Sequence, residues 1–125
     1  MSNSAWTDAR VVELKEIEEL VLVVGREGHD TIRVPVWVVA VDGDVYVRSY
    51  KGVTSMWFRR VQADFDQAIH LSSGDTSVHF ENVDRLDHVN HAIDAEFTRK
   101  YADFDYVGTM SEPAAVEATL RVHPR

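Results

Sequence analysis

The sequence contains no cysteine among its 125 residues, so disulfide bonds, thiol nucleophiles and cysteine-ligated metals are excluded. Its longest apolar runs, 20–24 and 34–41, are far shorter than the roughly 20 residues that a membrane-spanning helix needs. Positive charge is also scarce, with 13 basic against 21 acidic residues and a net charge of −8. Because nucleic-acid affinity comes largely from neutralised phosphates, general binding to nucleic acid is not expected.

The opening residues lack the basic segment followed by an apolar segment that marks a secretory signal, so we expect a cytoplasmic protein. A chain of this length fits a single domain over residues 1–125. Its apolar fraction of 45% is enough to bury a core.

Hydrophobic periodicity predicts about six strands and three helices. Asp42-Gly43 between two runs rich in β-branched residues predicts a tight hairpin. Pro35 within the first of these runs indicates an edge strand or a bulge. Thr7 is the expected N-cap of the first helix. We expect helices at 8–19, 55–65 and 86–101, and strands at 20–24, 32–41, 45–50, 68–71, 76–83 and 116–122.

This order of elements, in which hairpins dominate, favours a small antiparallel barrel or curled sheet with helices at its ends. It does not suit a doubly wound parallel fold. We find no internal repeat, low-complexity segment or linker.

One stretch runs against the acidic character of the chain. Residues 31–63 carry five basic and two acidic residues, a local balance of +3. A phosphate should bind where positive charge is concentrated. The segment 49–55 supplies hydroxyls, a cation and a flexible glycine, which are the groups that a phosphate site uses.

The candidate phosphate ligands are Arg48, Ser49, Lys51, Gly52 and Ser55. Arginine offers a bidentate fork, lysine a mobile charge and glycine a close backbone approach. Ser55, at the expected helix start, would add the positive end of a helix. The alternative is a polar hairpin end with solvated charges and an N-cap serine.

Other residues of this stretch have two interpretations each. Arg33 could face the same phosphate, because the hairpin lays its strand beside that of Arg48, or it could point outward. Trp37 and Trp57 could stack on an aromatic cofactor, although aromatic residues at such positions are more often core. Tyr46 and Tyr50 share the Arg48 face of their strand and could donate a proton, although packing is the commoner role.

The six histidines do not predict a metal site. His88 and His91 are three residues apart on the expected long helix, but they lie outside its apolar stripe. His70 and His79 lie on strands that could pair, without further ligands to support a site. A role for one histidine in haem binding is a weak third possibility.

The run Gly25-Arg26-Glu27-Gly28 followed by Arg33-Val34-Pro35 resembles the opening of the deazaflavin-dependent nitroreductases. A fuller pattern is similar to a bacterial family called domain of unknown function 2255, in the superfamily of FMN-binding split β-barrels. It comprises Pro35, Trp37-Val38-Val39, Tyr46-Val47-Arg48-Ser49, Gly52, Ser55 and Trp57, and the ending Ala118-Thr119-Leu120-Arg121 also matches.

This resemblance implies a six-stranded antiparallel split β-barrel with about three flanking helices. It implies a homodimer that binds FMN or a deazaflavin and transfers hydride to a small-molecule substrate. The implied cofactor residues are Arg33, Arg48, Ser49, Lys51, Gly52, Ser55 and Trp57. The alternative is a non-catalytic binding module or structural homodimer without flavin. It is favoured by Arg60 and Val61, which stand where the nitroreductases have Asn-Leu.

Overall fold

The computed structural model describes residues 5–125, so the first four residues of the expected domain lie outside the described part. That residues 1–125 form one domain stays a prediction. Within residues 5–125, no helix is long and apolar enough to cross a membrane.

The described chain contains seven strands, four α-helices and two short 3-10 turns. The strands are β1 (Leu20–Arg26), β2 (His29–Val36), β3 (Val38–Val41), β4 (Asp44–Arg48), β5 (Asp66–Leu71), β6 (Gly74–Asn82) and β7 (Thr119–Pro124). The helices are α1 (Asp8–Glu16), α2 (Met56–Ala63), α3 (Val89–Lys100) and α4 (Pro113–Glu117), with the turns η1 (Gly52–Thr54) and η2 (Val107–Ser111).

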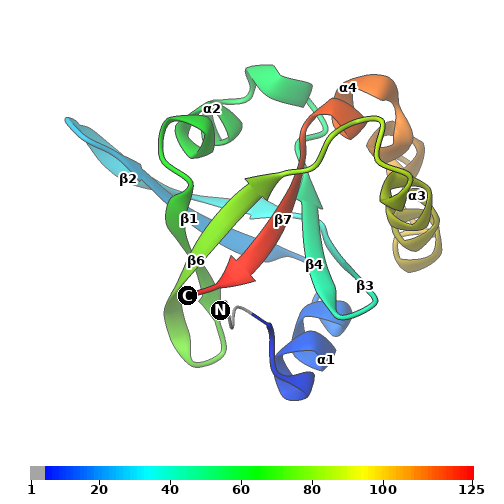
Figure 1. Cartoon of the computed structure of the whole chain (residues 1–125), viewed down its shortest axis with the longest axis horizontal. Helices are drawn as coiled ribbons and strands as arrows, with labels where there is room; N and C mark the ends of the chain where they lie inside the picture. The colour runs from blue at the N-terminus through cyan, green and yellow to red at the C-terminus, as the bar shows by residue number, and fades with distance from the viewer. Residues whose placement is uncertain (1–4) are drawn as a thin grey trace.

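All seven strands form one antiparallel sheet in the order β2-β1-β5-β6-β7-β4-β3. β2 and β3 stand at its two edges, although Trp37 alone separates them in the chain. The chain bends at Trp37, where it stops pairing with β1 and begins pairing with β4. The sheet therefore curls until its edges approach each other without pairing (Figure 1). This is a split β-barrel, as expected.

The expected strand count of six is one too low, because the predicted strand 32–41 is two strands that turn at Trp37. The position of Pro35 is explained by the same topology. β2 is an edge strand, and an edge tolerates a residue without a backbone N–H.

The core lies inside the curled sheet. Inward residues of every strand pack together, among them Leu22, Val47 and Phe80, which are fully buried. α1 and α2 close opposite ends of the barrel (Figure 1). A second apolar layer, which includes Ile93 and Phe97, lies between α3 and the outer face of β3 and β4.

Several local predictions are confirmed. Asp42 and Gly43 have φ of 52° and 84°, the paired positive values of the expected tight hairpin turn. The Thr7 side chain accepts a hydrogen bond from the Arg10 N–H and caps α1. On β4, alternate residues face the barrel interior and α3, as its period-two pattern predicts.

Several predicted boundaries are wrong, and two of them have a clear local reason. The third helix begins at Val89 rather than near Leu86, because the Asp84 and Asp87 carboxylates accept backbone N–H bonds and hold residues 84–88 in turns. The last strand begins at Thr119, because Pro113 starts the short helix α4 in the preceding residues.

Candidate ligand-binding pocket

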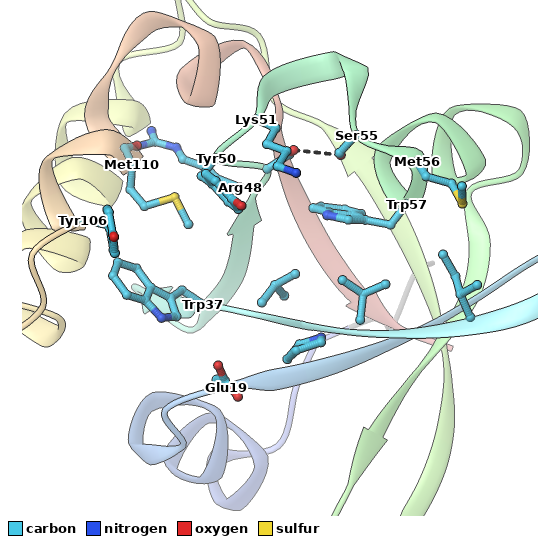
Figure 2. Close-up of a pocket in the computed structure, with 15 residues that line it drawn as sticks. Glu19, Trp37, Arg48, Tyr50, Lys51, Ser55, Met56, Trp57, Tyr106 and Met110 are labelled. Atoms are coloured by element: carbon cyan, nitrogen blue, oxygen red, sulfur yellow. Dashed lines mark hydrogen bonds between the residues drawn. The ribbon is translucent and has the colours of Figure 1, made fainter.

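A pocket of about 840 Å³ lies beside the edge strand β2, where the chain turns away from it at Trp37. One wall is β2, with Ile32, Val34 and Val36. The opposite wall comes from residues 48–51 at and after the end of β4 and from residues 55–57 at the start of α2 (Figure 2). Tyr106 and Met110 close a third side. The size is that of pockets that hold cofactors or drug-sized ligands.

Most of the pocket surface is apolar or aromatic. Trp37 borders it, but one face of its indole already stacks on Tyr101, with ring centroids 4.1 Å apart and planes 4° apart. Trp57 also borders it, and only 7% of this residue is exposed. Both tryptophans therefore form walls that are fixed by packing. Such walls suit a flat aromatic ligand.

One end of the pocket is polar. The hydroxyls of Ser49 and Ser55 are 2.8 Å apart and share a hydrogen bond, which Figure 2 marks at Ser55. This bond explains why Ser55, although at the N-cap position of α2, gives no side-chain cap. Lys51 lies beside them and is exposed, with its Nζ 5.8 Å from the centroid of the Tyr50 ring. Within residues 5–125, Lys51 makes no ion pair.

Arg48 borders the same end, but its guanidinium is turned to other partners. Its Nη1 donates to Asp94 at 2.5 Å and to the Met110 carbonyl at 2.8 Å. Its Nη2 donates to Asn90 and its Nε to Thr119, both at 2.9 Å. Burial lowers the pKa of Arg48, and the Asp94 carboxylate opposes that shift. The side chain is fully buried, so its charge is used within the protein.

Arg33 and Gly52 are also placed away from the pocket interior. Arg33 is exposed, pairs with Asp75 at 2.6 Å and is not among the residues that line the pocket. Gly52 has φ of +76°, and a Cβ there would lie 3.2 Å from the Ala114 carbonyl oxygen. Its close backbone approach is therefore to α4. Of the seven predicted cofactor residues, five border the pocket: Ser49, Lys51, Ser55, Trp57 and Arg48, whose guanidinium points to other partners.

The two tyrosines of β4 and its following turn separate. Tyr46 is 1% exposed under α3, and its hydroxyl accepts hydrogen bonds from Arg121. Burial raises its pKa. Tyr50 is 59% exposed and stands at the pocket mouth. Of Tyr46 and Tyr50, Tyr50 is therefore the one placed to contact a molecule in the pocket.

The sequence reasoning missed the residues that come from distant segments. Glu19, at the opposite end of the pocket from Lys51, is the carboxylate among the lining residues (Figure 2). Tyr106 and Met110 lie between the predicted helix 86–101 and the predicted strand 116–122, where neither helix nor strand was expected. The exposed apolar side chains in that loop were the available signal, since a loop without a packing role is usually polar.

Within residues 5–125, there is no group of three or more side chains that could hold a metal ion. His70 and His79 each bond a different carboxylate, Asp75 and Asp66. The lining residues of the pocket include no histidine.

A curled antiparallel sheet whose two edges stay unpaired, with a pocket beside its edge strand, defines a split β-barrel protein with a candidate ligand pocket. The family described as "Uncharacterized protein conserved in bacteria (DUF2255)" matches residues 10–122, and the chain belongs to this family. No curated protein matches the sequence.

Solved structures share the fold at low identity. A conserved hypothetical protein from Mycobacterium tuberculosis is 11% identical with a TM-score of 0.65, covering 99% of this chain and 83% of its own. An FAD-binding protein from Mesorhizobium loti is 12% identical with a TM-score of 0.62, covering 97% and 90%. An FAD and heme binding protein from Mycobacterium smegmatis is 16% identical with a TM-score of 0.55, covering 97% and 67%.

Proposed function

We propose that this protein binds a flavin-type cofactor, FMN or a deazaflavin, in the pocket beside β2 and acts as an oxidoreductase. The observation that carries the proposal is the pocket itself. It is large and walled by fixed aromatic and aliphatic side chains, and Lys51 and two serine hydroxyls lie at one end. Two proteins of the same fold, named as FAD-binding and as FAD and heme binding, support it.

The residues present fit such a group. Lys51 is free to pair with a phosphate, and the Ser49 and Ser55 hydroxyls can turn to donate to it. Trp57, Val34 and Val36 offer an apolar surface for a ring system. Since the Arg48 and Arg33 guanidiniums already have carboxylate partners, the proposal does not assign them to the phosphate.

A bound flavin or deazaflavin would supply hydride transfer, the chemistry that the protein itself lacks. The side chains of the chain then have three tasks: Lys51 fixes the anionic end, the tryptophan walls orient the ring, and the apolar lining excludes water from it. Tyr50 and Tyr106 stand exposed at the mouth and would meet a substrate first.

We also propose a homodimer. Tyr50, Met56 and Tyr106 are 59%, 57% and 76% exposed, and all three border the pocket. Large apolar side chains exposed together usually mark a surface that another molecule covers. A second copy of the chain would close the mouth and complete the substrate site.

The second candidate is a binding module without catalysis. Because Arg48 is committed to Asp94, Lys51 is the one cation left for a phosphate among the described lining residues. A site with a single exposed lysine would hold an anionic cofactor less firmly than one with an arginine fork.

The test is a titration of the purified protein with FMN and, separately, with a deazaflavin, followed by absorbance and fluorescence. We expect saturable binding of one of them. Val34→Trp, which fills the pocket, should abolish binding. Val12→Trp, at an exposed site on α1, should leave it unchanged. A folded protein that binds neither compound, or that binds equally well with Trp at position 34, would refute the proposal. A Soret band with added haem alone would point to a haem protein.

A further inference from the structure

One side of the pocket is formed by a segment that meets the sheet mainly through apolar packing: Phe104 lies 5.3 Å from Trp37, and Val107 and Met110 join the apolar layer on β3 and β4. Residues 102–112, here called the wall segment, place Tyr106 and Met110 on the pocket (Figure 2). Its backbone bonds are local: Phe104 N–H donates to Tyr101, and Thr109 N–H donates to Tyr106. Such bonds shape the segment but do not fix its distance from the opposite wall.

Arg48 adds a directional, polar attachment to this packing. Within residues 5–125, its bond to the Met110 carbonyl is the only hydrogen bond between the wall segment and the sheet. The same guanidinium holds Asp94 and Asn90 on α3 and Thr119 on β7. It also lies 5.6 Å from the centroid of the Phe97 ring. One planar group therefore joins β4, α3, β7 and the wall segment.

The choice of residue fits this role. A guanidinium presents five donors in a rigid fork, whereas an ammonium is a point charge with three. Only the fork can reach a carboxylate, an amide, a hydroxyl and a backbone carbonyl that lie in four different elements. The Asp94 side chain is one-third exposed, so the Arg48–Asp94 pair lies at the edge of the core and is not simply core packing.

We propose that Arg48 is a positioning residue, which sets the width of the pocket by holding Met110 and the wall segment against β4 without touching the ligand. The effect on a flavin rests on the proposed function. The attachment itself does not, and it can be measured without any ligand.

The main variant is R48M/D94L, which removes the attachment without leaving a buried charge unpaired. Its matched control is R99M/E96L. This variant removes an arginine–carboxylate pair on α3, the helix that carries Asp94, and neither residue of that pair lines the pocket. The chain has only three methionines and each double variant adds one, whose signal is absent from the wild-type spectrum, so methyl NMR resolves Met110 and Met56 on opposite sides of the pocket. Neither signal depends on global stability while the protein stays folded.

We expect R48M/D94L to shift or broaden the Met110 signal, to speed amide exchange in residues 104–111 and to weaken FMN binding by about tenfold or more. Met56 and the control variant should match the wild type. A folded R48M/D94L protein with an unchanged Met110 signal would overturn the proposal. If the wild type binds FMN, a folded R48M/D94L protein that binds FMN with the same affinity would overturn it as well.

Two further arms keep the test decisive. If the double variant does not fold, R48K replaces it, because an ammonium cannot serve Met110 and the α3 acceptors together. An unchanged Met110 signal in R48K would then overturn the proposal. If the wild type binds no flavin, the proposed function fails by itself, while the Met110 and exchange measurements still decide whether Arg48 holds the wall segment.

Discussion

Lys51 offers the sharpest test of how the pocket recognises a phosphate. Its ammonium is exposed, lies beside the Ser49–Ser55 hydroxyl pair and has no carboxylate partner within residues 5–125. Removing it therefore costs no internal ion pair. A hydrogen bond to a charged group contributes about 1.5–3 kcal/mol, which corresponds to a loss of roughly 10- to 150-fold in affinity.

The assay compares FMN with riboflavin, which has the same ring system and no phosphate. Lys51→Ala should weaken FMN by that factor and leave riboflavin unchanged. The loss should shrink as salt is added, because exposed charges are screened beyond about 10 Å at 0.1 M. The unfolding free energy should change by less than about 0.5 kcal/mol, as for exposed residues in general.

Arg59→Ala is the matched control, since Arg59 is an exposed cation of α2 that does not line the pocket. It tests whether any lost positive charge has the same effect. Equal losses for FMN and riboflavin in Lys51→Ala, or an equal loss of FMN affinity in Arg59→Ala, would refute the assignment of Lys51 to the phosphate.

Three further predictions concern the fold. Gly52→Ala should destabilise the protein by about 1–2 kcal/mol in urea unfolding, because φ is +76° and the new Cβ would crowd Ala114; an unchanged midpoint would contradict this. Tyr101→Phe should cost about 1–3 kcal/mol, because the hydroxyl accepts from the Val38 N–H and donates to the Glu18 carbonyl; a neutral result would show that neither bond matters. Hydrogen bonds from Arg33, and then from His70, hold the pKa of the Asp75 carboxyl below its ordinary value of 3.8. Ionised Asp75 therefore stabilises the folded protein above pH 3.8, and this contribution is lost as the pH falls through the folded-state pKa. Asp75→Asn should therefore lose less stability than the wild type between pH 5 and pH 2, with Asp103→Asn as control; parallel losses would refute this.

The parts of the fold that short-range signals encode could be predicted. Asp42-Gly43 demands two positive φ values, and the alternation of β4 assigns Val47 and Tyr46 to opposite faces whatever lies beyond. The bend at Trp37 could not be seen in the same way. Both halves of 32–41 are rich in β-branched residues, and only the pairing of each half with a different strand separates them.

The sequence singled out a loop that borders the candidate pocket, but it could not show which partners each of its residues has. The charge reversal over 31–63 pointed to the loop that does border the pocket. The partner of Arg48 is Asp94, 46 residues away, and no local pattern links them. Whether a basic residue is free for a ligand depends on such tertiary pairing, which a single sequence does not display.

The most direct test of the account is a crystal structure of the protein grown with FMN. The account predicts the ring against Trp57 and Val34 in the pocket beside β2, with the phosphate within hydrogen-bond distance of Lys51 Nζ and the Ser55 hydroxyl. Density for FMN elsewhere on the molecule, or a phosphate bound away from Lys51, would contradict it.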